Sequence, residues 1–292
     1  MRVFVTGISS FVGVRLARSF AAAGHEVRGS ARAPERLPAA LRDLRIERWS
    51  LDEPMPAALL AGTDVLVHCA YVLGPDPRGH NLTGTRAALA AGEVAGVARQ
   101  LFVSSFSAVP DAVSAYGRSK FELEQEFFAA GHGVVRPGLV IGPGGLFARF
   151  VQTTRRFPCV PLPDGGRRPV PLIGHDDLAA CVLALATGPV VRAANLCYTH
   201  RPALRDVVLA IARGLRLRRA IAPLPTALML PPLRLLAALR LGSPVTVDSI
   251  RAYRVNAEDQ HATDFPAFGL GEPDLDTVVG AALAAMAAAD WR

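Results

Sequence analysis

The sequence has few residues of the kinds that mark a disulfide-stapled or metal-binding protein. Its 292 residues include four cysteines, and none stands in a CxxC pair or at a spacing that, with histidine, would hold a metal ion. Isolated cysteines of this kind usually serve as small apolar side chains in proteins of reducing compartments. The sequence therefore predicts neither disulfides nor a metal site, and we expect a cytoplasmic protein.

Acidic residues are scarce relative to basic ones. The formal net charge is +7, which favours anionic partners, nucleic acids among them. The arginines are scattered along the chain, however, and aromatic residues do not interleave with them as they do in nucleic-acid-binding modules. We therefore expect no nucleic-acid partner.

No apolar run is long and uninterrupted enough to cross a membrane. The nearest candidate, residues 220–242, is broken by several prolines and arginines. Met1 leads directly into an apolar strand, which argues against a signal peptide. We expect no transmembrane segment, and we keep open a peripheral contact of residues 220–242 with a membrane or a partner protein, and a homodimer.

Hydrophobic residues, in contrast, are abundant and arranged in alternating strand-length and helix-length segments. They make up 51% of the chain. Strands that alternate with helices at this rhythm form a parallel sheet covered by helices on both faces. We therefore predict an α/β fold with a Rossmann-type, doubly wound parallel sheet. The expected strands are residues 2–6, 26–31, 45–49, 64–69, 100–104 and 134–136, and the expected helices are residues 11–23, 81–95 and 113–130.

The regular alternation of strands and helices ends after Gly142. Residues 158–171 are rich in proline and glycine, and the chain after Arg201 is mostly helical and punctuated by prolines. Helices are expected from Gly142 to Phe157 and over 176–186, with a strand over 193–197. We predict a Rossmann domain over residues 1–142, to which residues 172–197 return, and a smaller, mostly helical substrate-binding lobe over 143–171 and 198–292.

The turn after the first strand has features of a phosphate-binding turn. Gly7 and Gly13 stand where a missing side chain lets backbone amides approach a pyrophosphate, at the start of a helix whose N-terminus carries a partial positive charge. Ser10 replaces the middle glycine of the usual pattern, although the hydroxyls of Ser9 and Ser10 can donate to a phosphate. An ordinary glycine turn is the alternative, since the motif alone has many false matches.

The end of the second strand predicts which dinucleotide is bound. An acidic residue there suits a free ribose hydroxyl, and an arginine suits a 2′-phosphate. Ala31 occupies the position of the acid, and Arg32 follows it. Together with the turn, this favours NADP(H) over NAD(H); a solvated loop charge is the alternative for Arg32.

Tyr116 and Lys120 are four residues apart in a predicted helix, so they share one face of it. A phenol with a pKa near ~10 is a poor base at neutral pH, and a nearby ammonium favours its ionised form. We expect Lys120 to lower the pKa of Tyr116 and to bond a ribose hydroxyl. A packed tyrosine beside a solvated lysine is the alternative for an isolated pair of this kind.

A serine at the end of the fifth predicted strand completes the expected catalytic group. Such a hydroxyl can orient and polarise the substrate oxygen. Ser105 is the candidate for this role, with Ser104 and Ser107 as alternatives.

These segments together resemble the extended short-chain dehydrogenases/reductases of the NAD-dependent epimerase/dehydratase superfamily. The resemblance runs through residues 1–200 and is highly specific for the fold and for a nicotinamide dinucleotide. The matching segments are Thr6-Gly7, Phe11-Val12-Gly13, His68-Cys69-Ala70-Tyr71, Asn81-Leu82-Thr83-Gly84-Thr85, Val103-Ser104-Ser105, Tyr116 with Lys120, residues 136–143, His175-Asp176-Asp177-Leu178-Ala179 and Asn195-Leu196.

The resemblance implies roles for individual residues. Ser105, Tyr116 and Lys120 would be catalytic. The family often places an aspartate after the third strand against the adenine, and here either Ser50 or Asp52 takes that place. The cofactor-binding residues would be Gly7, Ser9, Ser10, Phe11, Val12 and Gly13 at the pyrophosphate, Arg32, Asp52, Ala70 and Tyr71 at the adenosine end, and Ser104, Tyr116, Lys120, Pro137, Gly138 and Val140 further along.

Two features depart from the usual pattern of this superfamily. One is Ser10, and the other is the distance from Ser105 to Tyr116, which only ten residues separate. So short a segment leaves little chain to cover a nucleotide sugar. The compact segment 104–120, together with residues 142–150 and 161–166, resembles an atypical branch of the superfamily. That branch includes proteins similar to the dinucleotide-binding accessory subunit of respiratory complex I, and some members bind the cofactor without catalysing a reaction. Unlike many of them, this chain keeps both Tyr116 and Lys120.

Three hypotheses about function follow. The first is an NADPH-preferring oxidoreductase that transfers hydride to or from a carbonyl or hydroxyl carbon of a small-molecule substrate. The second is a non-catalytic NADPH-binding accessory or scaffold subunit, and the third a sugar-nucleotide epimerase or dehydratase. Of the residues left without a catalytic role, we expect His68 in the core and Asp176 or Asp177 as the cap of a helix.

Overall fold

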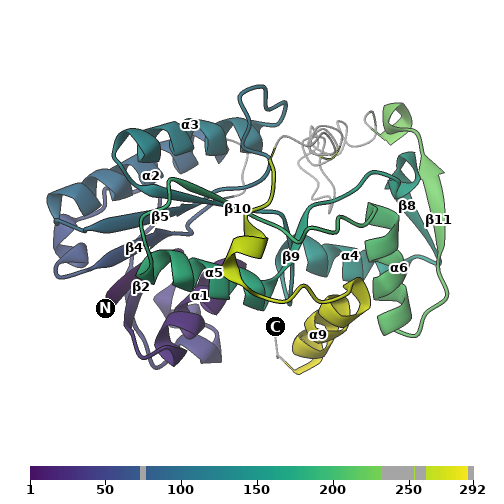
Figure 1. Ribbon diagram of the computed structural model, residues 1–292, viewed down its shortest axis with the longest axis horizontal. Coiled ribbons are helices and arrows are strands. Elements are labelled where there is room, and N and C mark those ends of the chain that lie inside the picture. Colours follow the sequence, from purple (N-terminus) through teal and green to yellow (C-terminus); the bar gives the residue numbers. More distant parts are fainter. Residues whose placement is uncertain (73–76, 230, 232–252, 254–260, 289–292) are drawn as a thin grey trace.

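A seven-stranded, fully parallel sheet dominates the computed structural model, which describes residues 1–72, 77–229, 231, 253 and 261–288 (Figure 1). The strand order is β10-β6-β5-β4-β1-β2-β3, so the direction of winding reverses between β1 and β4. The predicted Rossmann-type fold is thereby confirmed. The strands are β1 Arg2–Thr6, β2 Glu26–Ala31, β3 Arg45–Arg48, β4 Val65–His68, β5 Arg99–Val103, β6 Gly133–Pro137 and β10 Ala193–Leu196.

Helices cover both faces of this sheet. Helices α2 and α3 pack together on one face, and α1 and α5 pack together on the other (Figure 1). Their bounds are α1 Phe11–Ala22, α2 Pro77–Val94, α3 Ala115–Ala129 and α5 His175–Thr187, and short 3-10 turns η1 Pro34–Arg36, η2 Ala39–Leu41 and η3 Ala57–Leu60 join the strands.

Local sequence explains where helices α1 and α3 begin. The Ser10 Oγ accepts a hydrogen bond from the Gly13 N–H at 3.1 Å and so caps α1. The Ser114 Oγ accepts from the Gly117 N–H at 3.0 Å and caps α3. Each cap satisfies one of the free amides in a first helical turn, which fixes the start of the helix.

Apolar layers hold α3 and α1 rigidly on the sheet. On one face Phe102 of β5 stacks on Phe127 of α3 with ring centroids 4.9 Å apart, and both are buried. On the other face the buried Phe20 of α1 and Val182 of α5 belong to the main core cluster. Buried aromatic pairs of this kind add to the free energy of burial, so the loops at the strand ends are mounted on a rigid frame.

A smaller region lies to one side of the main sheet (Figure 1). It contains two two-stranded parallel sheets, β7 with β9 and β8 with β11. Its elements are β7 Leu139–Ile141, α4 Gly145–Arg156, β8 Cys159–Pro163, η4 Asp164–Gly166, β9 Leu172–Gly174, α6 Leu204–Gly214, β11 Ala220–Leu224, η5 Phe265–Phe268 and α9 Leu275–Ala288.

Four strands of this smaller region were not predicted. Strands β7, β8, β9 and β11 are only three to five residues long, and three of the prolines lie inside β8 and β11. Such short pieces carry too few residues for a periodicity to stand out, and proline argues against a strand. Their pairing depends on partners distant in the sequence, for example Ala220 with Cys159.

The remaining predictions for the second half of the chain have mixed outcomes. The helix expected from Gly142 begins at Gly145. Gly174 occupies the N-cap of α5 without a side-chain bond, so neither Asp176 nor Asp177 caps that helix. Of the segment 172–197, β10 joins the main sheet and β9 pairs with β7; the domain boundaries stay a prediction.

The apolar run over residues 220–242 is described only in part. Its first five residues form β11, and most of the others lie outside the described residues. Within the described part of the chain, no helix is long and apolar enough to cross a membrane.

Candidate functional site

A cleft opens at the carboxyl ends of β1, β2 and β4, where the direction of winding reverses. Its volume is about 170 Å³. Parallel sheets of this type bind ligands at this position, because the strand ends and helix N-termini meet there. The cleft is lined by Gly7, Ser9, Ser10, Ala31, Arg32, Trp49, Ser50, Leu51, Ala70, Tyr71 and Val72.

The turn between β1 and α1 needs glycine at two positions. Gly7 has a φ of +60°, and a Cβ on it would lie 2.6 Å from the Cα of Ala70. A Cβ on Gly13 would lie 2.4 Å from the carbonyl oxygen of Gly7. The backbone therefore closes tightly at this turn and keeps the N-terminus of α1 open toward the cleft.

Ser10 has a structural role that its sequence position did not reveal. Its Oγ caps α1 by accepting from Gly13, and its own N–H donates to the Gly7 carbonyl at 2.8 Å. Ser10 also lines the cleft. A serine can thus replace the middle glycine without loosening the turn.

Phe11 lies at the first position of α1, but its side chain points away from the phosphate turn. Its ring stacks on His175 with centroids 4.4 Å apart, and the Phe11 carbonyl lies 2.9 Å from His175 Nε2. Gly144 and Gly145 pack so closely on the ring that a Cβ on either would come within 3 Å of it. Only the backbone of Phe11 remains for a dinucleotide, and the next residue, Val12, packs against the core.

His175 is a residue that sequence reasoning had left without a role. Burial lowers its pKa to about 4, so the ring is neutral and its Nε2–H donates to the Phe11 carbonyl. The signal available in the sequence was its place at the start of a helix, next to the acidic pair. The contact with Phe11 joins segments far apart in the chain, which no local pattern encodes.

The end of the cleft beside β2 contains Arg32 and lacks an acidic lining residue. Ala31 ends β2, and Arg32 follows it with an exposed side chain. The nearest acid in the sequence, Glu35, is held by Arg48 at 2.8 Å. After β3 it is Ser50 that lines the cleft, between Trp49 and Leu51.

Asp52 is not among the residues that line the cleft. It lies 2.6 Å from Nδ1 of His80 and also accepts from the Ser50 hydroxyl at 3.3 Å. Of the two alternatives for the adenine position, the structure thus brings Ser50 to the cleft and turns Asp52 toward α2.

Tyr116 and Lys120 lie on one face of α3, as their spacing predicts. Lys120 is 5% exposed, and its Nζ donates to the carbonyl of Val103 at 2.7 Å. The Nζ lies 5.9 Å from the centre of the Tyr116 ring. The lysine is therefore tied to the end of β5, directly beside the tyrosine.

The pKa values of this pair differ from expectation. Burial raises the pKa of Tyr116 to about 12, although a hydrogen bond with Ser105 opposes the shift. Burial also lowers the pKa of Lys120 to about 8. The pKa of Tyr116 is thus raised and not lowered as expected, because burial removes water from the phenolate and the hydrogen bond with Ser105 offsets this only in part.

The serines after β5 fall into distinct roles. Ser105 is the one whose side chain bonds Tyr116, and its Oγ also accepts from the Ser107 N–H at 3.1 Å. Ser107 is buried. The Ser104 hydroxyl is buried without a hydrogen-bond partner among the described residues.

The segment Pro137 to Val140 connects the main sheet to the small region. The Pro137 carbonyl accepts from the N–H of Phe106, next to Ser105, at 3.2 Å. A Cβ on Gly138 would lie 2.5 Å from the Pro171 carbonyl oxygen, so glycine is required where β6 passes into β7. Val140 then pairs with Ile173 in the β7–β9 sheet.

Comparison with known proteins gives the family. Residues 3–196, more than half of the chain, match the NAD dependent epimerase/dehydratase family. The chain belongs to this family. This membership confirms the resemblance to the extended short-chain dehydrogenases/reductases of that superfamily. Nothing in these matches distinguishes the complex I-like branch.

One curated relative has a more specific name. It is the "Putative dihydroflavonol 4-reductase" of Synechocystis sp., which is 32% identical over 188 residues, 51% of this chain and 54% of the relative. The chain thus spans about half the length of the curated relative it matches.

Solved structures of the family share the fold. A nucleoside-diphosphate-sugar epimerase from Staphylococcus aureus superposes with a TM-score of 0.75 at 14% identity, over 96% of this chain and 100% of that one. MoeE5 in complex with UDP-glucuronic acid and NAD superposes with a TM-score of 0.68 at 22% identity, over 77% of this chain and 86% of that one. At these identities the likeness concerns the fold alone.

The residues at the cleft suit the pyridine nucleotide that the family implies. Gly7 and Gly13 stand where an added Cβ would collide with the backbone, so they leave room beside the N-terminus of α1. The first turn of α1 contains no acidic residue that would repel a phosphate. The buried, unpartnered Ser104 hydroxyl stands at the end of β5, one residue from Ser105. Among the described residues no group of His, Cys, Asp or Glu side chains is placed to hold a metal ion.

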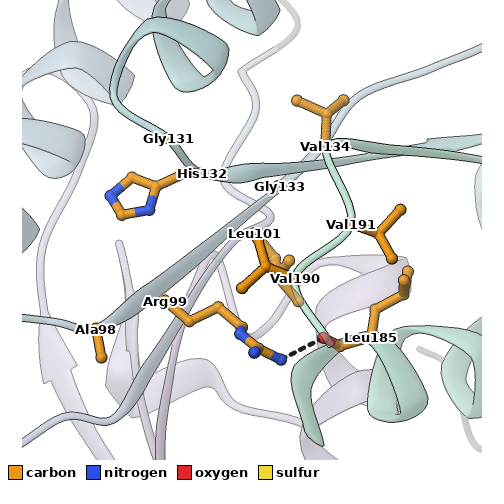
Figure 2. A pocket seen from close by; sticks show the side chains of 10 residues that line it. All are labelled: Ala98, Arg99, Leu101, Gly131, His132, Gly133, Val134, Leu185, Val190 and Val191. Atoms are coloured by element: carbon orange, nitrogen blue, oxygen red, sulfur yellow. Dashed lines mark hydrogen bonds between the residues drawn. The ribbon is translucent and has the colours of Figure 1, made fainter. Parts of the chain in front are cut away.

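A second hollow lies at the opposite edge of the sheet, at the amino ends of β5 and β6 (Figure 2). Its volume is about 20 Å³, close to that of a single water. Arg99 crosses it and donates to the Leu185, Ala186 and Gly188 carbonyls at 2.7–2.8 Å. This arginine caps the C-terminus of α5, so we regard the hollow as structural.

Proposed function

We propose that this protein is an NADPH-preferring oxidoreductase that transfers hydride to or from a carbonyl or hydroxyl carbon of a small molecule. The observation that carries the proposal is the group of Tyr116, Ser105 and Lys120 next to the dinucleotide cleft. The nicotinamide, when bound, supplies or takes up the hydride. The chain's own residues then have to hold the substrate oxygen and move its proton.

The high pKa of Tyr116 supports a role as acid in the direction of reduction. With a pKa of about 12 the phenol keeps its proton at neutral pH, so it can donate that proton to the oxygen of a carbonyl as negative charge develops there. Ser105 bonds the same hydroxyl and can orient the substrate oxygen beside it. The nearby Lys120 ammonium favours the phenolate that the donation leaves behind.

Arg32 supports the preference for NADPH. It is exposed at the end of β2, at a cleft whose lining includes no acidic residue. A guanidinium binds a phosphate through charge-assisted hydrogen bonds, whereas a free ribose hydroxyl is usually met by a carboxylate.

The compact segment between Ser105 and Tyr116 favours a substrate smaller than a nucleotide sugar. Phe106, Ala108, Val109 and Ala112 are all buried, so this segment packs on the protein and offers little surface to a ligand. The alternative is an epimerase or dehydratase, which the structural similarity to MoeE5 in complex with UDP-glucuronic acid and NAD supports.

A titration of nucleotide binding followed by a turnover screen tests the proposal. We expect NADPH to bind more tightly than NADH by about tenfold, the effect of one additional charge-assisted hydrogen bond. The screen measures NADPH oxidation over aldehydes, ketones and quinones, with Tyr116→Phe as the control. Tight binding without turnover on any carbonyl would favour the non-catalytic subunit, and conversion of a sugar nucleotide with retained NAD would favour the epimerase.

A further inference from the structure

Tyr71 stands between the dinucleotide cleft and Lys120. It lines the cleft, and the centre of its ring lies 4.8 Å from Lys120 Nζ. The same ring meets Tyr116 edge to face, with centroids 5.1 Å apart and planes at 80°. One side chain thus touches both members of the catalytic pair and the space that the nucleotide would fill.

The Lys120 ammonium is enclosed mainly by aromatic rings. The centre of the Phe102 ring lies 4.5 Å from Nζ, and one N–H donates to the Val103 carbonyl. Ring faces attract a cation, most strongly when water is excluded. The other groups acting on Lys120 are Cys69, whose own pKa burial raises to about 12, and Glu124 one turn further along α3. His68 also senses the ammonium, but burial keeps its pKa at about 4, so the ring remains neutral.

The backbone holds Tyr71 firmly from both sides. Before it, the Ala70 N–H donates to Thr6 Oγ1 at 3.3 Å. After it, the fully buried Asn81 of α2 accepts from the Val72 N–H and donates to the Val72 carbonyl, both at 2.8 Å. The backbone on the two sides of Tyr71 is therefore anchored to two different elements, Thr6 of β1 and Asn81 of α2.

We propose that Tyr71 is a positioning residue for Lys120: its ring covers the ammonium on the side of the cleft, excludes water from it and holds it beside Tyr116. The ring face, not only the bulk of the side chain, supplies this effect. The inference rests on the proposed function only in assigning Lys120 to catalysis; the enclosure itself is testable without a substrate.

The sequence makes this test selective, because Lys120 is the only lysine in the chain. Trace acetic anhydride reacts with neutral amines, and peptide mass spectrometry separates Lys120 from the amine at the N-terminus. The labelling rate of Lys120 against pH gives a midpoint, which reports the equilibrium between ammonium and amine, and a plateau, which reports access. The variants are Tyr71→Phe, Tyr71→Leu and Tyr71→Ala, with Val72→Ala as a neighbouring control in the same cleft.

We expect the wild type, Tyr71→Phe and Val72→Ala to share a low plateau and a midpoint near the Lys120 pKa of about 8. Tyr71→Ala admits water, so the plateau rises at least tenfold and the midpoint moves toward the ordinary lysine value of about 10.4. Tyr71→Leu keeps the bulk but loses the ring face, so the midpoint falls by about one pH unit.

Two results would overturn the inference. If Lys120 in Tyr71→Ala is labelled with the plateau and midpoint of the wild type, Tyr71 does not cover Lys120. If Tyr71→Leu matches Tyr71→Phe in midpoint, the ring face contributes nothing. Unfolding would move the midpoint of any variant upward, toward the ordinary lysine value. The expected fall in Tyr71→Leu runs in the opposite direction, so a variant that merely misfolds cannot imitate the whole pattern. Labelling as expected in a protein without carbonyl turnover would contradict the proposed function and leave the inference standing.

Discussion

Two single residues carry the proposed function at the smallest scale. In that proposal Tyr116 supplies the proton and Arg32 the charge that favours NADPH, and each residue makes a separate prediction. Both side chains stand at strand or helix ends, where small changes leave the sheet intact.

For Tyr116→Phe we expect turnover to fall by about 100-fold or more, since a positioned general acid contributes about 10²–10⁴. Nucleotide affinity should stay nearly unchanged, because the ring and its contact with Tyr71 remain. Stopped-flow turnover and a binding titration on the same preparation measure the two effects. Unchanged turnover would remove Tyr116 from the mechanism.

For Arg32→Glu we expect NADPH affinity to fall by about tenfold or more, because a charge-assisted bond is replaced by repulsion. The affinity of this variant for NADH should equal or exceed that of the wild type. Arg36→Glu is the matched control, since Arg36 is also exposed and only four residues away. Equal losses for both variants would mean that Arg32 acts only through the overall charge.

The pH dependence should follow Lys120 and not Tyr116. Because burial lowers the pKa of Lys120 to about 8, its ammonium is present below that pH and is lost above it. The Tyr116 proton, with a pKa of about 12, stays in place over the same range. Carbonyl reduction should therefore decline above about pH 8, and a rate that is flat to pH 10 would contradict this.

At the scale of elements, the turn from β1 into α1 is the most constrained part of the site. Gly13 cannot carry a side chain without moving the Gly7 carbonyl, and the turn also positions Ser10 and the N-terminus of α1. A defect here should weaken nucleotide binding as well as stability.

We expect Gly13→Ala to lower both nucleotide affinity and melting temperature, because its Cβ would lie 2.4 Å from the Gly7 oxygen. Gly280→Ala is the matched control: it lies in α9 with no atom within 4 Å of an added Cβ. That exchange should stabilise the fold by about 0.5–1 kcal/mol. Differential scanning calorimetry with and without NADPH compares the two, and an unchanged affinity for Gly13→Ala would exclude the turn from the binding site.

At the scale of the whole molecule, a buried ion pair joins α3 to the sheet. Glu124 has no exposed side-chain surface, and Arg136 of β6 reaches it at 2.5 Å and also donates to Asn195 of β10 at 3.3 Å. The Asn195 N–H in turn donates to Asp264 at 2.8 Å. This chain of contacts connects α3 with the edge strand β10 and with Asp264.

Removing one partner of this ion pair should therefore lower the free energy of unfolding much more than breaking a surface ion pair does. For Arg136→Leu we expect a loss of about 3–5 kcal/mol, because Glu124 is left buried and uncompensated. For Arg86→Leu, whose pairs with Glu122 and Glu126 are partly exposed to solvent, a loss of about 0–1 kcal/mol is expected. Urea unfolding followed by far-UV circular dichroism measures both, and equal losses would refute the difference in burial.

The sequence by itself determined the features that depend on neighbours along the chain. The alternation of strands and helices, the glycines of the turn, Arg32 after β2 and the spacing of Tyr116 and Lys120 all follow from local periodicity and backbone sterics. These were enough to predict the Rossmann sheet and the family.

Only the tertiary structure decided which residues from distant segments meet. It turned Ser50 rather than Asp52 to the cleft, placed Phe11 against His175, paired the short strands β8 and β11, and put Tyr71 over Lys120. It also reversed the expected shift of the Tyr116 pKa. The reason is that burial and desolvation depend on what packs around a group in three dimensions, and no spacing in the sequence encodes that.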